Sequence, residues 1–325
     1  MAIRAGAPRT LGVGPENAAI RFGEEAKTEG AWAGRRLMFV NGGPGFELSF
    51  WCGTCAPLFE RLEGANEKFT IGELAAILEE GADDLDESVI AAYGQLLEAG
   101  DYIPLLIETN PVLTVPGDDL DYFAHEQVDT FGIDGFWGLP HNPKTPYYRT
   151  FETSVSAKAH MYEFIVPMVP PSWNEEQRVL QYRARLSAGS VPTAVAVSIL
   201  DISGPEGHEP SSGWHQHWNL THFLLDGHHK VQASAETGRP IRLLSLLSVD
   251  SSLAKPRASI HPSRIAAILQ VPEPGRCIGS LRAWPATCCP ASGVNSGSPR
   301  AALRRGQGQG SAGNLDIASC GSIDH

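Results

Sequence analysis

The sequence predicts an α+β protein with two ordered parts and a disordered tail. Residues 31–170 alternate short apolar strands with amphipathic helices, which indicates an N-terminal mixed α/β domain. Residues 171–250 show the order helix, strand, loop, strand, helix, strand. Residues 256–325 are rich in Gly, Ser, Pro and Ala with little apolar periodicity, which is typical of disorder. We expect residues 1–30 to form a loose leader.

The composition excludes some classes of protein. The chain has 325 residues and a net charge of −12, so we expect no non-specific binding to nucleic acid, whose phosphates carry the same sign. No apolar run is long enough to span a bilayer, and residues 1–23 contain no apolar core of a secretory signal. The sequence therefore predicts a cytoplasmic protein that does not enter membranes.

The tail differs in composition from the rest of the chain. Residues 256–325 contain seven Arg, no Lys and three acidic residues, a net charge of +4, and four of the six cysteines. Two explanations stay open. The segment is either a natural basic tail or the product of a reading frame that shifts near the codon of Lys255, since GC-rich DNA read out of frame encodes Arg, Pro, Gly and Cys.

Local patterns predict the elements of the N-terminal part. Residues 35–40 and 46–51 predict two strands joined by the five-residue turn NGGPG. Thr70 with Glu73 forms the pattern of a capping box, which predicts the start of a helix. The other elements expected here are a helix over 86–100 and strands over 102–108 and 160–169.

The second part has clearer signals. Ser172 with Glu175 forms another capping box, and Gly189 follows the expected helix where a C-terminal glycine belongs. The apolar face of this helix consists of Val179, Tyr182 and Leu186. The remaining elements predicted are strands over 193–203, 220–226 and 241–250 and a short helix over 228–238.

A candidate anion site lies where the second of these strands turns into the short helix. The strand ends at Asp226, and Gly227 allows a sharp turn before His228, His229 and Lys230. The first amides of a helix have no intrahelical partner, and the helix dipole adds partial positive charge there. Basic side chains at such an end favour an anion, most often phosphate.

The segment 177–250 resembles the ParB/sulfiredoxin-like fold. In that family a helix and a "G…P" pattern precede a strand, and a second strand runs into Asp-Gly-His-His-Arg, a helix and a last apolar strand. The matching pieces here are "RLSAGSVPTAVAV", "HFLLDGHHKVQAS" and "TGRPIRLLSLLSV". The resemblance implies binding of nucleotide phosphates, with contacts from Gly227, His228, His229 and Lys230.

Departures from the family pattern narrow the activity that the resemblance implies. Sulfiredoxins have a catalytic Cys where this chain has His228, so we expect no sulfiredoxin activity. Lys230 replaces the usual Arg, which keeps the charge and loses the bidentate fork. Nothing after Asp250 resembles a helix-turn-helix, so we expect no sequence-specific DNA binding. Nucleotide binding is left, with phosphotransfer or hydrolysis of nucleotide or nucleic acid as possible reactions.

Roles for the residues of the turn follow from their chemistry. Asp226 is a candidate ligand of Mg²⁺ beside the phosphates of a nucleoside triphosphate or diphosphate. His228 or His229 is a candidate general acid or base, because imidazole titrates near neutral pH. In the alternative reading Asp226 caps the helix and both histidines are surface residues. A non-catalytic binding protein with a degenerate site is a separate alternative for the function.

Other histidines offer a second candidate site. His215 and His217 lie two residues apart, so in a strand they would share one face and could hold a metal such as zinc, with His222 nearby in sequence. Trp214 and Trp218 flank the pair and could instead stack a nucleotide base. A structural or solvent-exposed role is the third reading.

The stretch "WCGTCAP" places Cys52 and Cys55 between a predicted strand and a helical turn. This arrangement is typical of thiol oxidoreductases, in which Cys52 would attack and Cys55 would resolve. Zinc is a second option, although a four-ligand site needs a second pair of ligands. Two buried structural cysteines are the third, so an oxidoreductase or zinc protein stands as the alternative to a nucleotide-binding protein.

Overall fold

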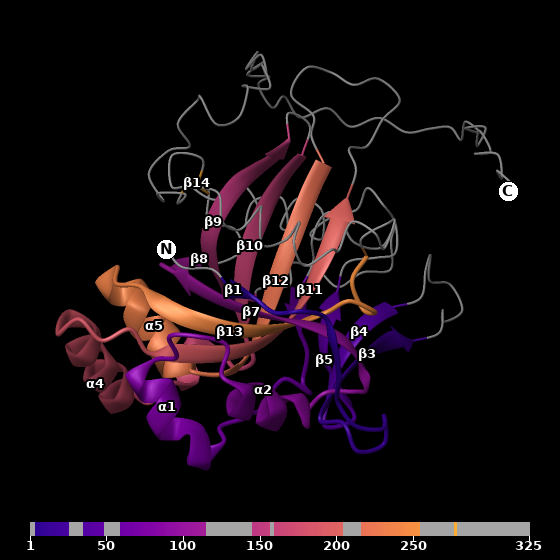
Figure 1. Cartoon of the computed structure of the whole chain (residues 1–325), viewed down its shortest axis with the longest axis horizontal. Coiled ribbons are helices and arrows are strands. Elements are labelled where there is room, and N and C mark those ends of the chain that lie inside the picture. The colour runs from indigo at the N-terminus through magenta and orange to yellow at the C-terminus, as the bar shows by residue number, and fades with distance from the viewer. Residues whose placement is uncertain are drawn as a thin grey trace, which may run out of the picture. The chain divides into compact units, whose positions relative to one another are not determined.

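The chain forms a mixed α+β structure built around one large sheet. The computed structural model describes residues 4–25, 35–48, 59–114, 145–156, 159–203, 216–253 and 276–277. The large sheet has ten strands in the order β1-β7-β13-β11-β12-β10-β9-β14, with β2 added on β7 and β8 on β9 (Figure 1). β10 runs parallel to β12 and β11 parallel to β13, and the other pairs are antiparallel.

The strands of the large sheet are β1 (Arg4–Ala5), β2 (Arg9–Leu11), β7 (Gly100–Thr109), β8 (Val112–Thr114), β9 (Tyr147–Ser156), β10 (Ala159–Pro167), β11 (Thr193–Ser203), β12 (Gln216–Asp226), β13 (Ile241–Ser248) and β14 (Arg276–Cys277). A second sheet has the strands β3 (Ile20–Glu25), β4 (Arg35–Val40), β5 (Gly43–Leu48) and β6 (Phe59–Arg61). The helices are η1 (Gly72–Leu74), α1 (Ala75–Glu80), α2 (Glu87–Gly94), η2 (Pro171–Trp173), α4 (Glu176–Ser187) and α5 (His228–Thr237).

The two predicted ordered parts share the large sheet, so the expected boundary near residue 170 does not separate two domains. β7 pairs with β13, and β10 pairs with β12. Residues 4–25 are also not a loose leader, since β1 and β2 pair with β7 and β3 pairs with β4. The physical reason is that the edges of a three-stranded β13-β11-β12 sheet leave backbone groups unpaired, and strands from the N-terminal part satisfy them.

The hairpin of β4 and β5 is tighter than the sequence predicted. Asn41 and Gly42 both have positive φ, 48° and 83°, and Val40 pairs directly with Gly43. This two-residue turn matches the twist of the flanking strands, and Asn-Gly is its commonest sequence. The five-residue loop expected from NGGPG was therefore wrong, because residues 43–45 belong to β5.

Neither predicted capping box forms. η1 begins after Ile71 without a side-chain cap, and the Thr70 hydroxyl donates instead to Oδ1 of Asp226 at 2.7 Å. α4 has Glu175 as its N-terminal cap residue, also without a side-chain hydrogen bond. By contrast, the carboxylate of Asp86 accepts hydrogen bonds from the first turn of α2. At Thr70 a tertiary partner outweighs local capping.

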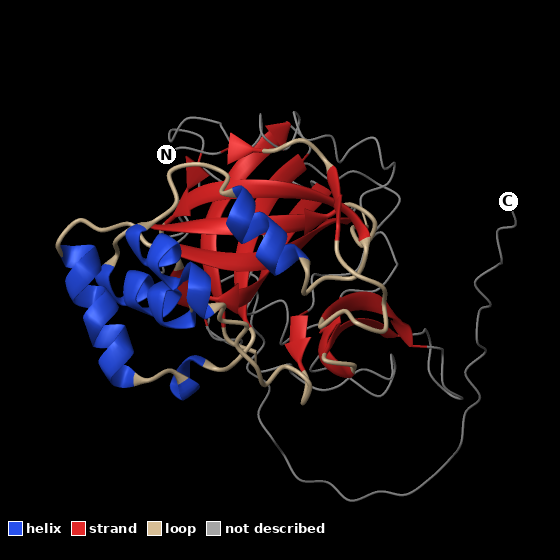
Figure 2. Ribbon diagram, turned by 60° about the horizontal axis from the view of Figure 1, so that its bottom comes forward, coloured by secondary structure: helices blue, strands red, loops and turns tan. Residues whose placement is uncertain are grey.

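Apolar clusters fix the layers of the fold. One face of the large sheet, including Phe223 and Leu225, packs against the second sheet and against α2. Part of the other face packs against α4 and α5, which bury Tyr182 and Val231 there. Figure 2 shows α4 and α5 gathered at one side of the large sheet, apart from α2. The turn between β12 and α5 lies in this helix-covered region.

A row of buried polar side chains crosses five adjacent strands of the sheet. Glu163 Oε1 lies 2.9 Å from His222 Nε2, and His222 Nδ1 lies 2.7 Å from Ser245 Oγ. Ser245 bonds to Ser198 at 2.9 Å, and Thr150 donates to the other Glu163 oxygen. Glu163 and His222 are 0% exposed, so each depends on the other for its hydrogen bonds. The row resembles a nucleophile–histidine–carboxylate chain, but its burial makes it a structural network that fixes strand register.

Truncation of the carboxylate in this row should destabilise the protein strongly. We expect Glu163→Ala to lower the free energy of unfolding by about 3 kcal/mol, because it leaves His222 and Thr150 buried without their partner. Urea unfolding followed by circular dichroism measures the effect. The control is Glu63→Ala, which removes an exposed carboxylate and should change the stability by less than about 0.5 kcal/mol. Equal stability of the two variants would show that the row does not contribute to the stability of the fold.

Candidate functional site

The turn between β12 and α5 requires glycine. Gly227 has φ 90° and ψ 20°, in the left-handed region, and it immediately precedes the first residue of α5. A Cβ atom at this position would lie 2.7 Å from the Cβ of Ala194 and 2.9 Å from its Cα. Both the conformation and the close approach to β11 therefore exclude a side chain here. The predicted strand, turn and helix around Gly227 are confirmed.

The three side chains after this glycine bind backbone groups of other segments. The Met168 N–H donates to Nε2 of His228, and the Glu175 N–H donates to Nε2 of His229, each at 3.1 Å. Lys230 Nζ donates to the carbonyl oxygens of Leu78 and Thr193, at 3.2 and 2.8 Å. The first turn of α5 thereby joins the end of β10, the start of α4, α1 and the start of β11.

These contacts define the proton positions on the histidines. Because Nε2 of His228 accepts a hydrogen bond, the neutral ring carries its hydrogen on Nδ1. Nδ1 of His228 is buried and has no hydrogen-bond partner within the described part of the chain, and the residue is 2% exposed. This orphaned N–H is costly unless a group outside those residues, such as a ligand oxygen, accepts it.

Burial keeps both imidazoles neutral. Desolvation, with the nearby charges of Lys68 and His229, lowers the pKa of His228 to about 3. Desolvation, with Lys68 and Arg178, lowers the pKa of His229 to about 4. At neutral pH neither ring can donate a proton as an imidazolium, and the lone pair of each Nε2 already accepts a backbone hydrogen. The geometry thus gives the histidines a structural role and does not favour the general acid or base role expected from the sequence.

Lys230 is held more tightly than a free surface lysine. Burial lowers its pKa to about 8, while the carboxylates of Asp226 and Glu79 oppose that effect. The ammonium group therefore remains mostly charged at pH 7. Two of its three hydrogens go to the carbonyls of Leu78 and Thr193, which leaves one for a ligand.

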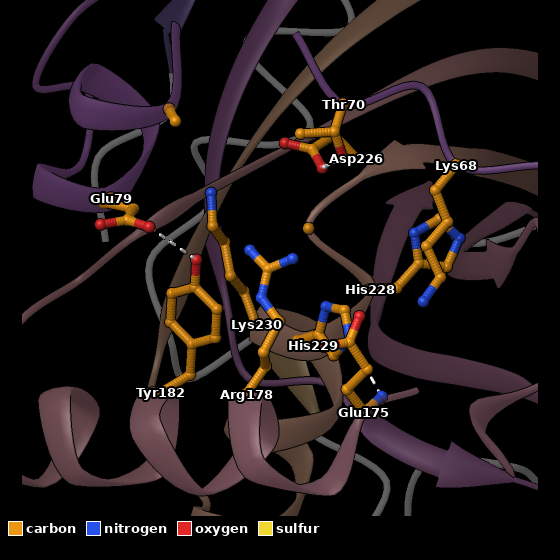
Figure 3. Close-up of a pocket in the computed structure, with 12 residues that line it drawn as sticks. Lys68, Thr70, Glu79, Glu175, Arg178, Tyr182, Asp226, His228, His229 and Lys230 are labelled. Carbon is orange, nitrogen blue, oxygen red and sulfur yellow. Dashed lines mark hydrogen bonds between the residues drawn. The ribbon is translucent and has the colours of Figure 1, made fainter. Parts of the chain in front are cut away.

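A pocket opens beside the first turn of α5 (Figure 3). Arg178 extends into it from α4, and Lys68 lies beside His228 on the segment that precedes η1. The cations around it are thus Lys68, Arg178 and Lys230, and the carboxylates are Glu79, Glu175 and Asp226. Thr70, Ala75, Tyr182 and Gly227 complete the lining together with both histidines.

Several of the acidic groups are already engaged. Glu79 accepts hydrogen bonds from Arg185 at 2.8 Å and from Tyr182 at 3.2 Å. Asp226 accepts from Thr70, and the residue before α5 is Gly227, which has no side chain to cap the helix. Gly227 and the first three residues of α5 line the pocket, so the positive end of the helix dipole lies beside it.

Sequence reasoning missed Lys68 and Arg178, two of the three cations that line this pocket. Arg178 lies three residues after Glu175 and four before Tyr182, so helical spacing could have placed all three on one face of α4. No sequence pattern marked Lys68 as a pocket residue. Lys68 reaches the pocket only because residues 68–70 pack against the end of β12 in the folded chain. There the Phe69 N–H donates to the Leu225 carbonyl at 2.8 Å.

The other predicted site residues fall elsewhere. Cys52, Cys55 and His215 lie outside the described residues. The backbone of His217 lies in β12, opposite His160 and Ser203, while His222 belongs to the buried polar row. Within the described ranges no three His, Cys, Asp or Glu side chains are grouped as a metal site, and no helix is long and apolar enough to cross a membrane.

Comparisons of the chain with models of protein families, with curated proteins and with solved structures find no match. The resemblance of residues 177–250 to the ParB/sulfiredoxin-like fold therefore stays a prediction that depends on the order of elements and on the Asp-Gly-His-His-Lys turn.

The neutral buried histidine should make the protein sensitive to mild acid. The pKa of His228 is about 3 in the folded chain and about 6.5 when unfolded, so between these values only the unfolded chain takes up a proton. The stability that neutral His228 contributes is complete above pH 6.5 and is lost as the pH falls. We expect about 1 kcal/mol of this loss between pH 6 and pH 5.

Urea unfolding at pH 7.5, 6 and 5 measures this dependence. The matched variant is His228→Gln, whose amide oxygen can accept the Met168 N–H and does not titrate. We expect its loss of stability between pH 6 and pH 5 to be about 1 kcal/mol smaller than that of the wild-type protein. An identical pH dependence of the two proteins would mean that His228 is not held neutral.

Proposed function

We propose that the protein binds the phosphate groups of a nucleotide in the pocket beside the first turn of α5. The observation that carries the proposal is the start of α5, which lines this pocket together with the three cations Lys68, Arg178 and Lys230. The first amides of a helix have no intrahelical acceptor, and phosphate oxygens are acceptors that a helix N-terminus favours.

The charges around the pocket support an anionic ligand. Arg178 offers a planar guanidinium that can bind phosphate oxygens in pairs, and Lys68 and Lys230 add two ammonium groups. Lys68 is partly committed, since it donates to Asn174 at 3.0 Å, which fixes its position. Of the carboxylates, Glu79 is paired with Arg185, so its charge opposes the ligand little.

Asp226 gives a reason for Mg²⁺ to accompany the nucleotide. Mg²⁺ usually binds one or two carboxylates together with substrate phosphates. Asp226 is the pocket carboxylate directly before the turn, and only one of its oxygens accepts from Thr70. A magnesium–nucleotide complex would therefore neutralise Asp226 as well as the phosphates, and we expect Mg²⁺ to tighten binding.

The geometry supports binding better than catalysis. The expected proton transfer by His228 or His229 in phosphotransfer or hydrolysis is not favoured, because both rings are held neutral with Nε2 occupied. The alternative of an oxidoreductase or zinc protein centred on Cys52 and Cys55 receives no structural observation, because these residues lie outside the described ranges.

Two arginines on the same helix allow a matched test of this proposal. Arg178 lines the pocket, whereas Arg183 forms an ion pair with Glu236 at 3.4 Å outside it. We expect Arg178→Ala to weaken binding of ATP or ADP about tenfold or more, since a hydrogen bond to a charged group contributes about 1.5–3 kcal/mol. Arg183→Ala should leave the affinity within about twofold.

Isothermal titration calorimetry at low salt, with ATP, ADP, CTP and GTP and with and without Mg²⁺, measures these affinities. The salt must be held constant, because phosphate contacts weaken as ionic strength rises. The proposal fails if no nucleotide binds the wild-type protein at millimolar concentration. It also fails if Arg178→Ala and Arg183→Ala weaken nucleotide binding by the same factor.

A further inference from the structure

Trp173 is an exposed aromatic residue beside the proposed phosphate pocket. Its exposed fraction is 56%, higher than that of Leu180 and Leu113, the other exposed large apolar residues in the described part of the chain. Single exposed apolar residues are common and need no explanation by themselves. Trp173 differs because its ring is fixed in place from one side and because Glu175, two residues further along the chain, lines the pocket.

The ring of Trp173 is stacked against an anchored cation. The guanidinium carbon of Arg61 lies over the ring, 5.1 Å from its centroid. Arg61 itself is held by hydrogen bonds to the carbonyl oxygens of Met168, at 3.2 Å, and Ala65, at 2.6 Å. Because Arg61 covers one face of the indole, the high exposure of the residue leaves the opposite face accessible.

The backbone of Trp173 is also fixed relative to the pocket. Trp173 ends η2, in which the Trp173 N–H donates to the Pro170 carbonyl at 2.9 Å. The next residue, Asn174, accepts from Lys68 and donates to Gln232 of α5 at 2.8 Å. The residue after that, Glu175, donates its N–H to His229. Two peptide units therefore separate the backbone of Trp173 from that of Glu175, which lines the phosphate pocket.

We propose that Trp173 stacks the base of a nucleotide whose phosphates occupy the pocket at α5. This inference rests on the proposed function, and it narrows the ligand from a phosphate compound to one with an aromatic base. Stacking on an indole suits any base, because every base has a π-face, so the site would select nucleotides over inorganic polyphosphates without reading the base. Because Arg61 already holds the indole in position, little side-chain entropy of Trp173 is lost when a base stacks on it.

A comparison of ADP with pyrophosphate separates the two proposals, because both ligands present a diphosphate and only ADP has a base. We expect the wild-type protein to bind ADP at least tenfold more tightly than pyrophosphate, which matches the usual contribution of one base stacked on an aromatic side chain. In Trp173→Ala this advantage should disappear while the affinity for pyrophosphate stays within about twofold. Trp173→Phe should retain most of the advantage, and Leu180→Ala, which removes an exposed apolar side chain from α4, should retain all of it.

Calorimetric titration of each protein with each ligand gives these values, and circular dichroism verifies the fold of every variant. The base-stacking inference is overturned if pyrophosphate binds and ADP is no tighter, or if Trp173→Ala keeps the full advantage of ADP. In both cases the phosphate site stands. If neither ligand binds the wild-type protein, the phosphate site and the stacking site are both overturned.

Discussion

The structure around the candidate site depends on backbone groups that would otherwise be buried without partners. Chain ends of β10, α4, α1 and β11 meet at the first turn of α5, and each presents an N–H or a carbonyl that folding removes from water. His228, His229 and Lys230 satisfy these groups with their side chains. Gly227 makes the arrangement possible, because its left-handed conformation and missing side chain let α5 begin directly against Ala194.

This constraint also decides which groups are left for a ligand. The histidine rings and two hydrogens of the lysine already bind groups within the protein, so the donors that remain for a ligand are the first amides of α5 and one hydrogen of Lys230. Arg178 and Lys68 complete the positive surroundings from two other segments. The same first turn therefore joins the surrounding elements and presents donors to the pocket, and a change in it should affect stability and ligand binding together.

Local patterns predicted the elements well and their assembly poorly. The strands over 35–40 and 193–203 and the helix that begins at His228 follow the predicted bounds, because hydrophobic periodicity and a glycine turn are local signals. The shared sheet was missed because strand pairing between distant segments leaves no local trace. For the same reason His222 could not be assigned from the sequence, since its partners Glu163 and Ser245 lie 59 and 23 residues away. The orphaned nitrogen of His228 follows from a hydrogen bond to Met168, 60 residues away, which no spacing rule predicts.

The most direct test of the proposed phosphate site is to observe the amide resonances of the first turn of α5 while an anion binds. Selective ¹⁵N labelling of histidine gives a spectrum in which His228→Gln and His229→Gln identify two resonances by their loss. We expect pyrophosphate to shift the His228 and His229 amide resonances more than those of the other nine histidines, and we expect the shifts to saturate. If these two resonances stay in place at saturating pyrophosphate, the start of α5 is not the phosphate site.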